Sequence, residues 1–206
     1  KIVAAWNAYA ITALAETGIL LERPDLVAAS VKTAELLWDL HIEPGFVRTS
    51  LAGQRSANAA VLEDHGAAIE AFIAVLGASG DDRWLTRAEH VADLVAVKFA
   101  DPAGGWFDTA SDAEQLLVRP RDLSDNAVPS GTAATVAGLL ALAAVTGETK
   151  HREAAIAGIE VTAAIATGAP RFAGWTLAAA EALLAGPAEV AVVGEVGGAM
   201  HRAALA

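Results

Sequence analysis

The side chains best suited to chemistry are concentrated between residues 104 and 132. This segment brings two aromatic residues, several carboxylates, two arginines and an asparagine into one connection with no obvious helix of its own. Aromatic ring faces stack on the C–H surfaces of sugars, while carboxylates hold hydroxyl groups or transfer protons. The candidates in this segment are Trp106, Phe107, Asp108, Arg119, Asp125, Asn126 and Ser130. A connection this long is uncommon unless it has a function or is disordered, and its apolar content argues against disorder.

A second group of candidates lies outside this segment. Trp6 and Asn7 stand near the start of the chain, and another long connection, 43–63, leads to a carboxylate and a histidine. We assign acid or base chemistry to Asp64, His65, Asp108 and Asp125. The imidazole titrates near neutrality, and paired carboxyl groups are what glycosidases use. The aromatic and polar candidates, including Trp6 and Asn7, are assigned to substrate binding.

Several candidates also have a structural interpretation. Asp64 and Ser130 stand where helices are expected to begin, so their oxygens suit the free amides of a first turn. His65 is more typical of a solvated or core-edge histidine than of a catalyst. The alternative for the aromatic pair 106–107 is a plug that packs the connection onto the helices. For Arg119 the alternative is an anchor for loop carbonyls or an ion pair.

Composition restricts the class of partner. The net charge of −11 argues against a nucleic acid or an anionic membrane surface. The sequence has no cysteine, which excludes disulfides and thiolate metal sites. The other histidines show no ligand spacing, so we predict no metal site and no cofactor. The chain begins without Met and without a signal-peptide layout. Its longest uncharged run, 126–147, starts with a turn-like segment, and the rest is too short to span a membrane; we expect a cytoplasmic protein.

The abundance of alanine predicts an all-α protein. Expected helices come in three similar pairs: 8–18 with 26–40, 65–80 with 83–99, and 130–147 with 150–167. The first helix of each pair is nearly uncharged and ends at a glycine, and the second is charged on one face. Gly80 follows Gly18 by 62 residues and precedes Gly147 by 67. Repetition on this scale indicates a stacked or circular helical array, with inner first helices and outer second helices.

The end of the chain departs from this pattern. A fourth inner helix is expected over 170–184, followed by a short β segment over the β-branched run 189–193 and a final helix from 199. Both long connections, 43–63 and 101–129, join an outer helix to the next inner one. They should therefore lie at the same end of the array and bring the candidate residues together.

Six short motifs resemble a known family. They are KIVAAWNAYAITALA at 1–15, VLED at 61–64, GGWFDT at 104–109, VRPRD at 118–122, SDNAVPSG at 124–131 and EVAVVG at 189–194. In this order and spacing they are similar to the helical domain of the thioredoxin-domain-containing, spermatogenesis-associated protein 20-like family. That domain is an α/α toroid, similar in fold to six-hairpin glycosidases and N-acylglucosamine 2-epimerase.

The resemblance implies that residues 1–206 are one partial α/α toroid, the later portion of a larger helical domain. The thioredoxin-like domain and the first hairpins would lie outside it. We expect exposed apolar side faces that self-associate or pack on those other parts. The resemblance also implies a carbohydrate-active hydrolase, epimerase or isomerase with a small sugar as ligand. The alternative is a non-catalytic binding or scaffold domain that serves the thioredoxin-like partner.

Overall fold

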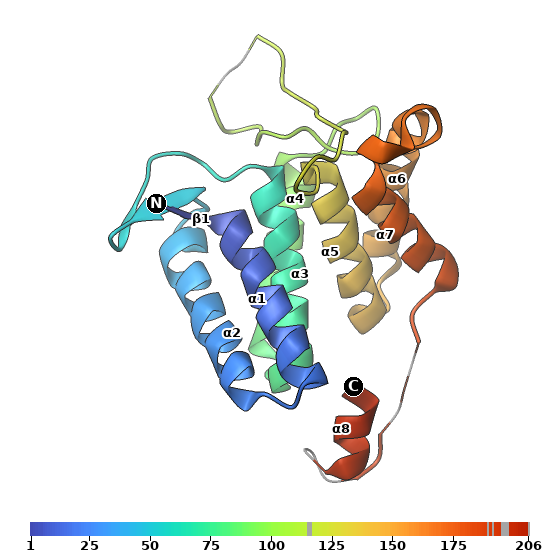
Figure 1. The fold of residues 1–206 in the computed structure, drawn as a ribbon. Coiled ribbons are helices and arrows are strands. Elements are labelled where there is room, and N and C mark those ends of the chain that lie inside the picture. The colour runs from blue at the N-terminus through green and yellow to red at the C-terminus, as the bar shows by residue number, and fades with distance from the viewer. Residues whose placement is uncertain (115–116, 189, 191, 195–197, 206) are drawn as a thin grey trace.

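The computed structural model describes residues 1–114, 117–188, 190, 192–194 and 198–205, and helices dominate it (Figure 1). The α-helices are α1 (Ala4–Leu20), α2 (Pro24–Leu37), α3 (Leu62–Ser79), α4 (Arg83–Lys98), α5 (Gly131–Thr146), α6 (Thr149–Gly168), α7 (Gly174–Ala185) and α8 (Ala199–Leu205). A π-helical turn, η1 (Trp38–Ile42), continues α2, and a 3-10 turn, η2 (Pro170–Phe172), precedes α7. The prediction of a mainly α-helical chain is confirmed.

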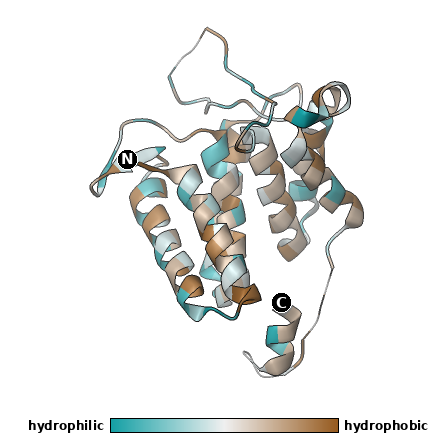
Figure 2. Cartoon of the chain, in the orientation of Figure 1, coloured by the Kyte–Doolittle hydropathy of each residue, from teal (hydrophilic) through white to brown (hydrophobic). Residues whose placement is uncertain are grey.

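The helices form an inner and an outer layer of one arc. The inner helices α1, α3, α5 and α7 pack side by side in that order, and α2, α4 and α6 each pack against the inner helix before them (Figure 1). α3 is buried along most of its length, whereas α4 buries one face. α5 contains no charged residue and is drawn almost entirely in neutral and hydrophobic tones (Figure 2). The predicted division into inner helices with few charges and outer helices with several is confirmed for these two pairs.

Glycines allow α3 and α5 to approach closely. A Cβ atom on Gly66 would lie 2.4 Å from the amide nitrogen of Thr135, and one on Gly138 would lie 2.7 Å from the carbonyl oxygen of Gly66. Real Cβ atoms do not come this close to backbone atoms, so the spacing of the two helices requires glycine. This close packing places the N-termini of neighbouring inner helices side by side.

The predicted glycine ends hold for two of the three inner helices. Gly80 and Gly147 follow α3 and α5 in the left-handed conformation, with φ values of 68° and 70°. The prediction for Gly18 was wrong, because α1 continues to Leu20. Gly18 is instead buried in the α1–α2 contact, where a Cβ atom would lie 2.7 Å from Val27 Cγ2.

A small antiparallel sheet stands at the start of the arc. β1 (Ile2–Val3) pairs with β2 (Thr49–Leu51), which pairs with β3 (Gln54–Arg55). These strands have two or three residues each, too few for an alternating pattern to predict them. In the expected β segment at 189–193, Glu189 and Ala191 lie outside the described residues, and the other three are in no strand.

The arc is open, and α1 and α7 are the ends of its inner row (Figure 1). Large apolar side chains are exposed on both end helices, among them Trp6 on α1 and Leu177 and Leu184 on α7. This agrees with the expected exposed side faces of a partial toroid. In the part of the chain that the structure describes, no helix combines the length and apolar character needed to cross a membrane.

Candidate functional site

The two long connections lie at the same end of the arc, where the inner helices begin (Figure 1). They are joined there by a hydrogen bond of 2.9 Å from the backbone amide of Leu62, at the start of α3, to the carbonyl oxygen of Asp108. Most of the residues selected from the sequence therefore gather at this end. They differ in what their polar atoms contact.

Asp64 is fully buried, and both of its carboxylate oxygens accept backbone hydrogen bonds. Oδ1 accepts from the amide of Ala5 in the first turn of α1, and Oδ2 accepts from the amide of Val61, both at 3.0 Å. Burial raises the pKa of Asp64, while these amides and the nearby Arg48 act in the opposite direction. The carboxylate therefore holds the N-terminus of α1 against that of α3, from the third position of α3 rather than from its N-cap.

Asp125 repeats this arrangement at the other end of the arc. Its Oδ1 accepts from the amide of Ser130 at 2.9 Å, and its Oδ2 accepts from the amides of Trp175 and Thr176 in the first turn of α7 at 2.9 and 3.1 Å. Ser130 caps α5 as predicted, since its hydroxyl oxygen accepts from the amide of Ala133 at 3.1 Å. Asp125 therefore joins the starts of α5 and α7.

His65 is buried between two aromatic rings. Its ring centroid lies 4.4 Å from that of Phe46 and 4.6 Å from that of Phe99. Its Nδ1 lies 2.9 Å from the carbonyl oxygen of Val61, which can only accept, so Nδ1 carries the proton. Burial lowers the pKa of His65 to about 4, so the imidazole is neutral at physiological pH. The position matches the core-edge alternative.

Asp108, Arg119 and Phe107 organise the 99–130 connection. Asp108 Oδ2 accepts from the amide of Asp122 at 2.7 Å, and burial raises the pKa of Asp108. The guanidinium of Arg119 lies 4.2 Å from the centre of the Phe107 ring and donates to the carbonyl oxygens of Lys98, at 3.0 Å, and Thr109. These contacts match the predicted alternative in which Arg119 anchors loop carbonyls.

The remaining residues selected from the sequence do not come together at one site. Trp106 is buried against α6, where a Cβ atom on Gly158 would lie 2.5 Å from its ring. This is the plug described by the structural alternative. Trp6 is 63% exposed, and Asn126 is also exposed. The Asn7 side chain donates to the carbonyl oxygen of Val3 at 2.8 Å.

The inner helices carry a cluster of polar residues, Tyr9, Glu63 and Glu70, that were not selected from the sequence. Glu63 and Glu70 are seven residues apart and so lie on one face of α3. Glu63 pairs with Arg48, with an oxygen-to-nitrogen distance of 3.3 Å. The hydroxyl of Tyr9 and the other Glu63 oxygen, Oε1, are enclosed and make no hydrogen bond of normal geometry to the described residues. Glu70, seven residues after Glu63 and the one charged residue in the stretch 66–79 of this inner helix, was the signal available in the sequence.

The titration of this group follows from its burial. Burial is the largest cause that raises the pKa of Glu63, of Glu70 and of Tyr9. The charges of Glu63, Glu70 and Asp64 raise the pKa of Tyr9 further, which places the phenol among the three carboxylates. A carboxyl group with a raised pKa exchanges protons closer to neutrality, as acid–base chemistry requires.

A trough of about 570 Å³ adjoins Glu70. Its walls are alanine and leucine side chains of α5 and α7, and Glu70, Arg152 and Trp175 also line it. Trp175 is 52% exposed, which leaves much of its surface open to a ligand. An apolar trough with an indole ring and a titratable carboxyl has the composition of a small-molecule site.

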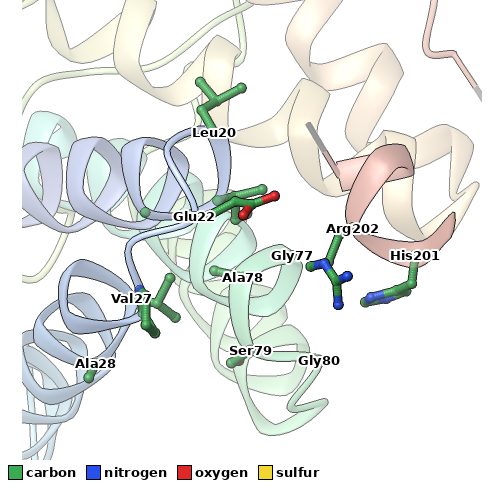
Figure 3. A pocket seen from close by; sticks show the side chains of 13 residues that line it. Leu20, Glu22, Val27, Ala28, Gly77, Ala78, Ser79, Gly80, His201 and Arg202 are labelled. Atoms are coloured by element: carbon green, nitrogen blue, oxygen red, sulfur yellow. The ribbon is translucent and has the colours of Figure 1, made fainter. Parts of the chain in front are cut away.

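A larger hollow lies where the α1–α2 turn meets the end of α3. It measures about 790 Å³ and is closed on one side by His201 and Arg202 of α8 (Figure 3). None of the residues selected from the sequence lines it. Over the described ranges, no group of three histidine or acidic side chains is arranged to hold a metal ion.

Comparisons with known proteins identify related sequences and folds. No protein-family model matches the chain. It is 31% identical over 160 residues to spermatogenesis-associated protein 20 of Mus musculus, and 27% identical over 160 residues to the protein of the same name of Rattus norvegicus. Each match covers 71% of this chain and 20% of the relative, so the chain spans about a fifth of the length of these relatives.

Two solved structures are similar in fold. Cellobiose 2-epimerase from Spirochaeta thermophila DSM 6192 superposes with a TM-score of 0.63 at 20% identity, over 78% of this chain and 42% of that protein. Cellobiose 2-epimerase from Bacillus thermoamylovorans B4167 gives a TM-score of 0.64 at 12% identity, over 77% and 43%. The fold is therefore that of an α/α toroid, as predicted.

Proposed function

We propose that the chain, which is similar in sequence to spermatogenesis-associated protein 20 and in fold to two sugar epimerases, is a carbohydrate-active α/α-toroid domain. The proposed site is the inner face of the arc, where Glu70 lines the trough between α5 and α7 and Glu63 lies two helical turns away on the same face of α3, beside Tyr9. One observation carries the proposal. Glu70 presents a carboxyl of raised pKa at the edge of a trough that an exposed indole also lines.

The proposed reaction type is proton transfer on a sugar. The two solved structures of similar fold are cellobiose 2-epimerases. Epimerisation inverts one carbon, so a proton must be removed from one face of that carbon and a proton delivered to the opposite face. We assign removal to Glu70 and delivery on the opposite face to solvent water, sugar-ring stacking to Trp175, and hydroxyl binding to Tyr9 and Glu63.

Asp64 and Asp125 take a different role in this proposal. Both bind backbone amides at the starts of two inner helices, so they act as positioning residues for the end of the arc. Arg119 and Phe107 hold the connection that covers this end.

The test is a search for turnover with the full chain. Reducing mono- and disaccharides are incubated with it in D₂O, and proton NMR records deuterium at C2 and appearance of the epimer. A parallel panel of glycosides tests hydrolysis. We expect epimerisation of at least one reducing sugar, and Glu70→Gln to lower kcat at least about a hundredfold, as expected for loss of a general acid–base group.

The matched control is Glu148→Gln. Glu148 pairs with Lys150 at the turn between α5 and α6 and lines none of the hollows described above. This variant should keep the activity of the unmodified chain. The acid–base assignment is wrong if Glu70→Gln and Glu148→Gln are equally active.

A binding module without turnover is the second candidate. It is favoured because both oxygens of Asp64 and both oxygens of Asp125 are engaged by amides, so neither carboxylate is free for chemistry. Saturable sugar binding by calorimetry, abolished by Trp175→Ala, with no turnover of any panel member, would select it.

A further inference from the structure

A separate cavity of about 250 Å³ lies on the other side of α3. It is enclosed by the turn after η1, by α4 and by the loop around Ala110. His65 lines it. Because His65 follows Glu63 by two residues, about 200° around the helix, this cavity faces away from the proposed sugar site.

His65 offers an acceptor to this cavity. Its Nδ1 is occupied by the Val61 carbonyl and carries the ring proton, which leaves Nε2 with a lone pair. Nε2 makes no hydrogen bond to the described residues and is not among their enclosed polar atoms, so it opens into the cavity that the ring lines. His65 is only 3% exposed, and its tilted contact with Phe46 and edge-on contact with Phe99 hold the orientation of the ring and so the direction of Nε2.

An ion pair and a histidine–carboxylate contact line the same cavity. Lys98 Nζ lies 2.8 Å from Asp112 Oδ2, and His90 Nε2 lies 3.7 Å from Glu43 Oε1. Lys98 and Asp112 are close enough to His65 to influence its titration. Lys98 and Asp112 are partly exposed, so Lys98 can exchange Asp112 for a ligand carboxylate at little cost. Phe46, Leu94 and Ala60 supply apolar surface.

We propose that this cavity binds a small α-hydroxy or α-amino acid. The hydroxyl or ammonium group donates to His65 Nε2, and the carboxylate binds Lys98. The apolar walls accept a short side chain. Glu43 and Asp112 give an ammonium group additional acceptors, which a hydroxyl group does not need. The site is independent of the proposed sugar chemistry.

The test is a titration of the full chain, labelled with ¹⁵N-histidine, with L-lactate, L-alanine and propionate. Propionate keeps the carboxylate and the short chain but lacks the donor. We expect a saturable shift of the His65 Nε2 resonance with L-lactate, L-alanine or both, and binding at least about tenfold weaker for propionate. Tighter binding of L-lactate than of L-alanine would identify the ligand as an α-hydroxy acid, and the reverse order would identify it as an α-amino acid.

Two variants test the residues. Lys98→Met should weaken binding at least about tenfold, whereas Lys150→Met, on an exposed lysine paired with Glu148, should leave it unchanged. His65→Phe keeps an aromatic ring between Phe46 and Phe99. Calorimetry should show that this variant binds L-lactate and L-alanine no more tightly than the unmodified chain binds propionate. The proposal is overturned if neither acid gives a saturable shift, if propionate binds as tightly as L-lactate, or if the two lysine variants bind alike.

Discussion

Asp64 in α3 accepts a hydrogen bond from the amide of Ala5 in α1 at 3.0 Å, across 59 positions of sequence. The contact between Asp125 and the amide of Thr176, at 3.1 Å, repeats it between the start of α5 and α7. Each carboxylate lies at the N-terminal end of a neighbouring helix, where the helix dipole favours negative charge. The inner helices are thus joined in pairs at the end that carries both long connections.

Removing the first of these carboxylates should destabilise the chain. Asp64→Ala leaves two buried amides without an acceptor, so we expect it to lower the free energy of unfolding by about 2–4 kcal/mol. Asp64→Asn keeps one acceptor oxygen and should cost about half as much. Urea denaturation measures both. Asp82→Ala is the control, because Asp82 is exposed and its side chain makes no capping hydrogen bond; equal losses for Asp64→Ala and Asp82→Ala would contradict the assignment.

The second carboxylate should act locally on α7. In Asp125→Ala the amides of Trp175 and Thr176 lose their acceptor, and hydrogen exchange in the first turn of α7 should accelerate at least about tenfold. Exchange in α1 and α3 should not change. Ser130→Ala, which removes only the cap of α5, should cost about 1 kcal/mol and leave α7 protected. Uniformly faster exchange across the chain would argue against a local role.

The fold was largely predictable from the sequence because its signals are local. A glycine near the end of the first helix, few charges on the inner helices and charged outer faces recur along the sequence, and the two connections stand out by their composition. Gly18 shows the limit. Its sequence context matches that of Gly80, but Gly18 serves a helix contact rather than a turn.

The site was less predictable from the sequence. A residue's type shows which chemistry its side chain can perform, but not whether its polar atoms are already hydrogen-bonded in the fold. Asp64 has the side chain of an acid–base group, yet both of its oxygens are taken by amides 3 and 59 positions away. Glu70 is not among the residues selected from the sequence. Its raised pKa arises from burial in the arc and from Glu16 of α1, a neighbour that only the folded chain supplies.

Replacing either of two glycines of α3 by alanine should change the stability of the chain, and the two changes should have opposite signs. Gly66→Ala places a Cβ atom 2.4 Å from the Thr135 nitrogen, so α3 and α5 must separate, and we expect a loss of about 3 kcal/mol or more. Gly77→Ala meets nothing within 4 Å and should stabilise the helix by up to about 1 kcal/mol. Thermal and urea unfolding of the pair measure the difference. Two losses of similar size would show that the close approach of α3 and α5 does not determine the effect at Gly66.

Lowering the pH should destabilise the folded chain because of His65. Its pKa is lowered from 6.5 to about 4 by burial, so between these values the unfolded chain binds a proton that the folded chain does not. Stability is therefore complete above pH 6.5 and decreases as the pH falls to 4, by up to about 3 kcal/mol. The raised pKa values of Glu63 and Glu70 act in the opposite direction, so the comparison is made with a variant. Unfolding curves of the unmodified chain and of His65→Phe should diverge across this window, and parallel curves would show that His65 is not neutral in the folded chain.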